Sequence, residues 1–357
     1  MNDLEMKILE NIFKNNLIED GDRIIFAVSG GPDSICMLNA LYNLKTVKAD
    51  KEFWKKNDRK SKMYQKSLSL LPDFTIIVAH VNHMIREEAV YDELFVKEYC
   101  EERNIDFYSK SIDVQKIANN KKIGLEEAGR IARYDFFDEV AKKTNANKVA
   151  IAHNKNDSVE TIIMHALRGS GTLGLQGIQA KNDKYIRPLI ECERAEIEKY
   201  CEDNNIEARI DKTNFENDYT RNKIRNVVIP YVKEEFNPNI IDTIYRLSIL
   251  IKEENVYIEN QVQKTYKDIL EIEDNKEIVL NLKAFNEQEK VIKSRIILYT
   301  INRLFGSCKG IEKIHIEDIL KLCSNNVGNK FLTPNKNLKV FLKLRKSAFY
   351  KNWRLNL

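Results

Sequence analysis

Short apolar runs alternate with amphipathic helical patterns over about the first 190 residues, and this alternation limits the fold more than any other feature. Runs that are apolar throughout fit strands buried on both faces of a parallel sheet. Strands that alternate with helices predict a doubly wound α/β domain. The predicted strands cover residues 23–28, 74–81, 106–112 and 148–152, and the predicted helices cover 35–44, 87–104, 125–143 and 158–167.

The pattern changes after Cys192, where helical periodicity replaces the alternation. One apolar helix face recurs over 240–251. A further helix over 287–304 and short strands over 330–350 predict a small α+β domain at the C-terminal end. We therefore expect a catalytic domain over residues 1–215, a helical region over 216–270 and a small C-terminal domain over 271–357.

The composition fits a protein surrounded by water. Hydrophobic residues make up 43% of the chain and charged residues 31%. No apolar run reaches the roughly 18 residues of a membrane span, and the N-terminus lacks a signal-peptide pattern. We expect a cytoplasmic protein without a membrane partner. The six cysteines include no C-x-x-C pair, so buried free thiols are expected rather than a metal cluster.

The turn Ser29-Gly30-Gly31-Pro32-Asp33-Ser34 joins the first predicted strand to the first helix. Its two glycines let backbone N–H groups converge on a phosphate, and the helix N-terminus adds partial positive charge. The serine hydroxyls can donate to the same phosphate. Asp33 fits a Mg²⁺ ion that bridges to phosphate, because a carboxylate alone would repel it. The alternative is an ordinary strand-to-helix turn.

A second glycine-rich stretch, Gly169 to Gly174, spells G-x-G-x-x-G. The dinucleotide-binding fingerprint must follow a strand and open a helix. This stretch follows a predicted helix instead, so we expect an active-site loop there.

The first loop resembles the signature of the PP-loop, or N-type ATP pyrophosphatase, family, and it contains no Walker A motif. Further motifs resemble the tRNA(Ile)-lysidine synthetases within that family, strongly over about residues 20–240 and loosely beyond. The motifs are Ala79-His80-Val81-Asn82-His83-Met84-Ile85-Arg86, Glu126 to Tyr134, Ala152 to Thr161, Leu167 to Gly171, Arg187-Pro188-Leu189, Asp211-Lys212-Thr213-Asn214 and Arg221-Asn222-Lys223-Ile224-Arg225.

This resemblance implies an α/β fold of the adenine nucleotide alpha hydrolase type and an ATP- and Mg²⁺-dependent ligase. The substrates would be free L-lysine and a tRNA(Ile) with a CAU anticodon. ATP would adenylate O2 of the wobble cytidine with release of pyrophosphate, and the lysine amine would then displace AMP. The sequence leaves open whether the chain acts as a monomer or as a homodimer.

The resemblance also assigns residues to roles. It implies a catalytic role for Asp33, His153 and Asp157, with Asp33 as the metal ligand. The residues implied to bind ATP are Ala27, Ser29, Gly30, Gly31, Pro32, Asp33, Ser34, His80 and Arg130. The residues implied to contact lysine or tRNA are Asp157, Glu160, Arg133, Arg168, Arg221 and Arg225.

Some positions carry alternatives. Asn154 and Asn156 stand where the family pattern has a histidine and an aspartate. Arg130 and Arg133 share a helix face, where they either contact substrate or pair with neighbouring glutamates. A helix-surface role is likewise the alternative for Arg221 and Arg225. His80 and His83 could suggest zinc, but their spacing alone is a weak signal.

Two other functions fit part of the sequence. One is another PP-loop enzyme, such as a tRNA thiolase, although the chain lacks the cysteine pairs that such enzymes often use. The other is a degenerate PP-loop protein that only binds RNA, which the intact loop at residues 29–34 disfavours.

Positive charge is concentrated in two segments. Residues 45–66 hold nine basic and three acidic residues, within a polar stretch, 45–73, that we expect to be a surface insertion. No acidic residue follows Asp318, whereas basic residues recur from Lys330 to Arg354. Clustered positive charge is typical of a surface that contacts a polyanion. The alternative is a solvated lysine-rich surface.

We expect neutralisation of Lys343, Arg345 and Lys346 to weaken tRNA binding. Each lost phosphate contact reduces the number of counterions that binding releases from the tRNA. The dependence of log Kd on log salt concentration should flatten by roughly one unit per lost contact. Filter binding across a salt series measures the slope. An unchanged slope would assign this segment to the solvated surface.

Overall fold

The computed structural model describes residues 3–50, 62–84, 89–207, 220–324, 330–335, 337–343 and 346–351. The chain forms two compact units, Met1–Ile249 and Leu250–Leu357. The three regions expected from the sequence remain a prediction. Some sequence expectations lie outside the described residues, namely those on 51–61, Ile85, Arg86, the motif at 211–214 and Arg345, and the side chains of Lys343 and Lys346 are not described.

A six-stranded sheet forms the centre of the first unit, in the order β3-β2-β1-β4-β6-β5. The strands are β1 (Asp22–Ala27), β2 (Phe74–Asn82), β3 (Asp106–Ser111), β4 (Lys148–Ile151), β5 (Lys181–Asn182) and β6 (Tyr185–Ile186). All neighbouring pairs are parallel except β5 with β6. The predicted parallel sheet is therefore confirmed, with a short antiparallel edge pair that the sequence did not indicate.

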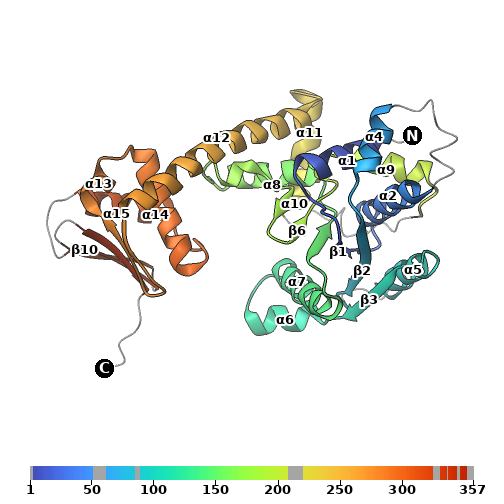
Figure 1. Ribbon diagram of the computed structural model, residues 1–357, viewed down its shortest axis with the longest axis horizontal. Helices are drawn as coiled ribbons and strands as arrows, with labels where there is room; N and C mark the ends of the chain where they lie inside the picture. Colours follow the sequence, from blue (N-terminus) through green and yellow to red (C-terminus); the bar gives the residue numbers. More distant parts are fainter. Residues whose placement is uncertain are drawn as a thin grey trace. The chain divides into compact units, whose positions relative to one another are not determined.

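Helices cover both faces of this sheet (Figure 1). The helical elements of this unit are α1 (Asp3–Lys14), α2 (Pro32–Ala49), α4 (Lys62–Leu70), α5 (Ala89–Glu101), α6 (Val114–Lys121), α7 (Leu125–Thr144), α8 (Lys155–Leu167), the 3-10 turn η1 (Gly174–Gln176), α9 (Arg194–Asp203), α10 (Thr220–Lys223), the π-helical turn η3 (Ile224–Val228) and α11 (Ile229–Glu235). The next helix, α12 (Ile240–Ile269), begins in this unit and belongs to the second unit from Leu250 onward.

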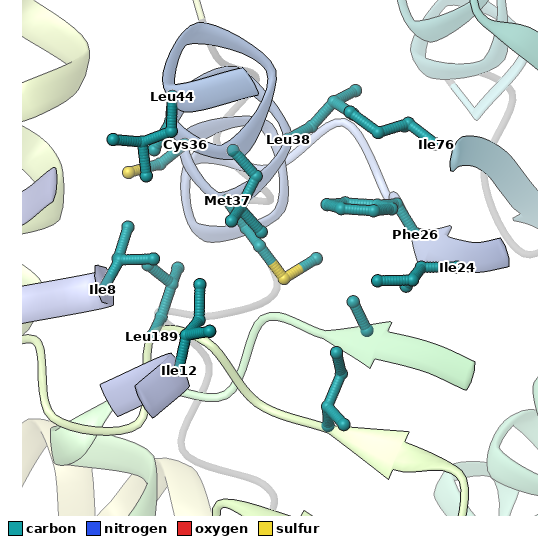
Figure 2. Packing of buried hydrophobic residues seen from close by; sticks show 14 of the residues in the cluster. Ile8, Ile12, Ile24, Phe26, Cys36, Met37, Leu38, Leu44, Ile76 and Leu189 are labelled. Carbon is teal, nitrogen blue, oxygen red and sulfur yellow. The ribbon is translucent and has the colours of Figure 1, made fainter. Parts of the chain in front are cut away.

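Alternation along β1 explains why both faces are covered. Ile24 and Phe26 belong to the large core that α1 and α2 close, where Figure 2 shows them facing Met37. Ile25 points to the other face, where it belongs to a core with Phe136 of α7. Successive side chains of a strand point to opposite faces, so an apolar run of this kind needs a helix layer on each side.

The second unit is a small α+β domain, as predicted. Its antiparallel sheet has the order β7-β8-β11-β10-β9. Its elements are β7 (Leu270–Glu273), β8 (Glu277–Asn281), α13 (Leu282–Asn286), α14 (Lys290–Phe305), α15 (Lys313–Ser324), β9 (Phe331–Asn335), β10 (Leu338–Lys343) and β11 (Lys346–Lys351). The sequence predicted strands only in 330–350 and missed β7 and β8, which pair with each other and, through β8, with β11.

The expected surface insertion at 45–73 is only partly correct. Helix α2 continues to Ala49, and α4 follows the undescribed segment 51–61. Leu68 of α4 and Leu71 are buried in the large core. Two apolar residues one turn apart in a polar stretch are a weak signal for a buried helix face, so the sequence did not show that these leucines pack into the core.

The described part of the chain bears on the expectations about membrane spans and cysteines. No helix there is long and apolar enough to cross a membrane. All six cysteines are free, and only Cys308 is not fully buried.

We expect Gly177→Ala to lower the free energy of unfolding by about 2 kcal/mol or more. Gly177 has φ 66° and ψ −155°, a conformation that is essentially restricted to glycine. An added Cβ would also lie 2.3 Å from Ser158 Oγ, which accepts a hydrogen bond from the amide of Ile178. Urea unfolding measures the change.

The matched control is Gly171→Ala, because an added Cβ there meets no atom within 4 Å. Equal stability of the two variants would show that the backbone at Gly177 is not constrained.

Candidate active site

The loop from Ser29 to Ser34 leads from β1 into α2 at the carboxyl edge of the sheet. The Ser34 hydroxyl donates to the Gly31 carbonyl at 2.9 Å and accepts from the Ser29 amide at 3.1 Å. Gly30 has φ 90°, which a side chain would strain. Pro32 occupies the first turn of α2, where its missing N–H costs nothing. The loop is thus folded by its own polar groups around the N-terminus of an 18-residue helix.

His80 of β2 stabilises the backbone that leads into this loop. Its Nδ1–H donates to the Val28 carbonyl at 2.9 Å, and burial lowers the pKa of the ring. The amide of Val28 also donates to the Ala79 carbonyl, which extends the pairing of β1 with β2 beyond Ala27. The Nδ1 atom of His80 is therefore used in the framework, and a contact with ATP at this residue remains a prediction.

Asp33 lies in the first turn of α2 and faces α8. Its Oδ1 accepts a hydrogen bond from Asn154 Nδ2 at 3.2 Å. Burial, together with the negative charge of Asp157, raises the pKa of Asp33 to about 6, although Arg194 and Arg225 oppose the shift. A carboxyl group whose pKa is raised toward neutral pH in this way is typical of functional sites.

Asn154 caps the helix that carries the second group of site residues. Its Oδ1 accepts from the Asp157 amide at 3.0 Å, and Asp157 Oδ2 accepts from the Asn154 amide at 3.0 Å. This capping box satisfies amides that α8 would otherwise leave unpaired. Asn156 Oδ1 accepts from the Arg194 amide, which ties α8 to the start of α9. Both asparagines that depart from the family pattern therefore have structural roles.

Arginines surround the two carboxylates of α8. Arg225 in η3 makes bonds of 2.7 and 2.8 Å to Glu160 and a 3.0 Å bond to Asp157. Arg221 in α10 donates to Thr161 Oγ1 at 2.6 Å and lies 3.4 Å from Glu160. Charge-assisted bonds of this kind offset the cost of burying Glu160, which is 1% exposed. The helix-surface alternative for Arg221 and Arg225 is thus not what the structure shows.

Arg194 is a site residue that the sequence did not indicate. Its Nη2 lies 3.6 Å from Asp157 Oδ1, and its positive charge lowers the pKa of Asp33 against the effect of burial. In the sequence, Glu193 and the helical pattern that follows Arg194 indicate only an ordinary helix start. Only the packing of α9 against α2 shows that this helix start faces the loop.

The two arginines of α7 lie in different surroundings. Arg130 pairs with Glu127 at 2.8 Å and stacks over Tyr134, as the ion-pair alternative describes. Arg133 instead lies near the histidines that follow β2 and β4, since its charge lowers the pKa of both His83 and His153. Arg133 therefore faces the carboxyl edge of the sheet, where an anionic substrate would lie.

Arg168 is not brought to the carboxylates. It is the exposed C-cap of α8, about 16 Å along the helix from Asp157 by the rise per residue. The glycine-rich stretch follows directly, and His165 Nδ1–H donates to the Gly174 carbonyl within it. The stretch follows a helix and not a strand, so the dinucleotide interpretation is excluded as predicted.

His153 follows β4, and its ring contacts Arg187, which the sequence motifs included without assigning it a role. Arg187 Nε donates to His153 Nδ1 at 3.2 Å. Burial lowers the pKa of His153 to about 4, the nearby arginines act in the same direction, and Asp157 opposes them. The imidazole is therefore neutral at physiological pH.

A strand that ends in a glycine loop at the N-terminus of a helix, beside the carboxyl group of Asp33, has the arrangement of a nucleotide-binding α/β domain. The PP-loop domain family model matches residues 2–232. Two curated proteins similar to the chain are the tRNA(Ile)-lysidine synthases of Clostridioides difficile and Clostridium acetobutylicum. The first is 41% identical over 94% of this chain and 68% of the relative, and the second is 44% identical over 92% and 66%.

The chain belongs to the tRNA(Ile)-lysidine synthase family. It spans about two thirds of the length of the curated relatives. A solved structure of a U34-tRNA thiolase from Methanococcus maripaludis shares the fold, with a TM-score of 0.52 at 17% identity over 70% of this chain and 79% of that one.

We expect Asp33→Asn to stabilise the protein near neutral pH, measured in EDTA. The folded state binds the Asp33 proton more tightly than the unfolded state, because the pKa rises from 3.8 to about 6. Stability is therefore lost as pH rises through this range. At about 1.4 kcal/mol per pKa unit, the variant should gain about 3 kcal/mol near pH 7 and little near pH 4.

The control is Asp106→Asn, an exposed carboxyl group at the start of β3 and so at the opposite edge of the sheet. It should change stability little at either pH. A gain for Asp33→Asn that does not depend on pH would contradict the assigned cause.

Proposed function

We propose that the chain ligates free L-lysine to C2 of the wobble cytidine in a tRNA(Ile) with a CAU anticodon. The observation that supports this most is the bond from Asn154 to Asp33, which joins the phosphate-binding loop to the carboxylates of α8. Nucleotide activation and amine capture therefore have groups within one continuous site. The cytoplasm, where tRNA and ATP occur together, is the expected location.

The reaction has two steps in this proposal. Cytidine O2 attacks the α-phosphorus of ATP, the bond to the bridging oxygen breaks, and pyrophosphate leaves. The ε-amine of lysine then adds to C2, AMP departs with O2, and the nitrogen loses a proton. Adenylation is needed because O2 alone is a poor leaving group. Donors of the loop and the N-terminus of α2 stabilise the charge that grows on pyrophosphate.

The residues present fit Mg²⁺ bound with ATP. Asp33 is half-buried near Asp157, and partial desolvation together with repulsion from Asp157 raises its pKa, so a cation there would relieve an unfavourable charge. Among the described residues, no group of three or more acidic, cysteine or histidine side chains could form a metal site without phosphate. Mg²⁺ usually binds through one or two carboxylates plus substrate phosphates. When bound, it would neutralise the phosphates, and Asp33 is the residue that would hold it.

Asp157 and Glu160 are the groups we assign to lysine. They already form ion pairs with Arg225, so the lysine ammonium must share or displace this guanidinium. The energetic cost of that exchange is small only if the arginine finds another anion, such as a phosphate of the nucleotide. Arg133 and Arg221 are assigned to the nucleotide or the tRNA.

A tRNA thiolase is the second candidate, because one such enzyme shares the fold. No C-x-x-C pair is present in the chain, and five of the six cysteines are buried. These observations favour the ligase.

Homodimer formation also remains a prediction.

The test is to incubate the protein with ATP, Mg²⁺, lysine and a CAU-anticodon tRNA. We expect radiolabelled lysine to enter the tRNA and pyrophosphate to be released with it. ATP turnover that is indifferent to lysine would rule out the ligase.

We expect Asp33→Ala to abolish lysine incorporation while tRNA affinity changes less than about threefold, or 0.7 kcal/mol. Asp106→Ala, at the opposite edge of the sheet, should retain activity. A comparable loss of tRNA binding in Asp33→Ala would show that the loop has a different role.

A further inference from the structure

His153 and Arg187 meet because they follow neighbouring parallel strands. β4 pairs with β6, and His153 and Arg187 lie just beyond the carboxyl ends of these strands. Arg187 Nε donates to His153 Nδ1 at 3.2 Å, and Arg187 Nη1 donates to the Gln179 carbonyl at 2.7 Å. Arg187 is buried, with 7% of its surface exposed. Its guanidinium is therefore held in one orientation toward the imidazole.

This contact determines which nitrogen of His153 carries the proton. A guanidinium has five N–H donors and no acceptor. The Nδ1 atom must therefore present its lone pair to Arg187. A neutral imidazole has one N–H group, so the proton lies on Nε2.

The charged groups around His153 come from four elements. Asp157 of α8 favours protonation of the ring, whereas Arg187 after β6, Arg221 of α10 and Arg133 of α7 oppose it. The balance keeps the imidazole neutral. Within the part of the chain that the structure describes, His153 Nε2 has no hydrogen-bond partner, and the ring is half-buried at the carboxyl edge of the sheet. The Nε2–H group is thus available to a ligand.

We propose that Arg187 is a positioning residue that fixes His153 as the Nε2–H tautomer, so that His153 donates a hydrogen bond to an acceptor oxygen of the bound nucleotide substrate. The identity of this acceptor rests on the proposed function, whereas the tautomer does not.

The same geometry excludes His153 as the base that takes a proton from the lysine amine. In a Ser-His-Asp triad, a carboxylate accepts the Nδ1–H bond and leaves the Nε2 lone pair free to accept a proton. Here the partner of Nδ1 is a donor, so the polarity of the ring is reversed. The Nε2 atom already bears hydrogen, and Nδ1 is occupied by Arg187.

Nuclear magnetic resonance tests the tautomer without any activity measurement. The chain contains five histidines, so a protein labelled with ¹⁵N-histidine gives few ring signals. His153→Gln identifies the His153 signals by their loss. We expect His153 to show an unprotonated Nδ1 and a protonated Nε2. A protonated Nδ1 in the wild-type protein would overturn the inference.

Variants of Arg187 test what fixes the tautomer. Arg187→Lys keeps a donor and should keep the Nε2–H form, whereas Arg187→Met should give a mixture of both tautomers. Thermal unfolding checks that both variants are folded. If Arg187→Met leaves the tautomer unmixed, then Arg187 does not fix it, and the proposal fails.

Variants of His153 distinguish donor from base in the lysine ligation assay. The amide of His153→Gln can donate near the Nε2 position but cannot act as a base. We expect its kcat to stay within about tenfold of wild type, whereas His153→Ala should lose about 10²- to 10³-fold. Equal losses in both variants would indicate a base and overturn the proposal. A protein without ligase activity but with the Nε2–H tautomer would refute the proposed function and leave the role of Arg187 intact.

Discussion

The hydrogen bonds of Asn154 connect the two parts of the site. Its Oδ1 accepts a hydrogen bond from the Asp157 amide and so caps α8, and its Nδ2 donates to Asp33 in the first turn of α2. Two helices that start at the same edge of the sheet are thereby held at a fixed separation. Ligands in open α/β sheets bind at this edge, where loops from several strands converge. The positions of both carboxylates thus depend on one buried amide, which is 0% exposed.

Charge balance is the second condition for this arrangement. Asp33, Asp157 and Glu160 lie close together, and Arg194, Arg221 and Arg225 lie among them. Burying carboxylates without partners would be very unfavourable, so the arginines stabilise this group of carboxylates. In the proposed function, these arginines would exchange their ion pairs for the phosphates of a bound nucleotide, so the ion pairs would partly set the affinity for substrate.

The parallel sheet, its helix layers and the loop at Ser29–Ser34 could be predicted from the sequence, because apolar runs and glycines act locally. Contacts between distant elements could not. Arg194 looks like an ordinary helix start, and its approach to Asp157 depends on how α9 packs. β5 and β6 have two residues each, too few to show a period. The spacing Asn-x-x-Asp before a helix is that of a capping box, so the role of Asn154 as a cap could be predicted, whereas its bond to Asp33 could not.

The π-helical turn η3 limits the insertions and deletions that this part of the chain can accept. The Ile229 amide bonds to the Ile224 carbonyl, five residues back, so the segment carries one residue more than an α-helix would need. Loss of a residue between Arg221 and Arg225 would let the helix continue without a break, yet it would change the spacing with which both arginines approach Glu160. Insertions and deletions are therefore constrained here even where an individual side chain such as Lys223 is exposed. The spacing itself, more than the side chains between the arginines, is the property that selection would have to preserve.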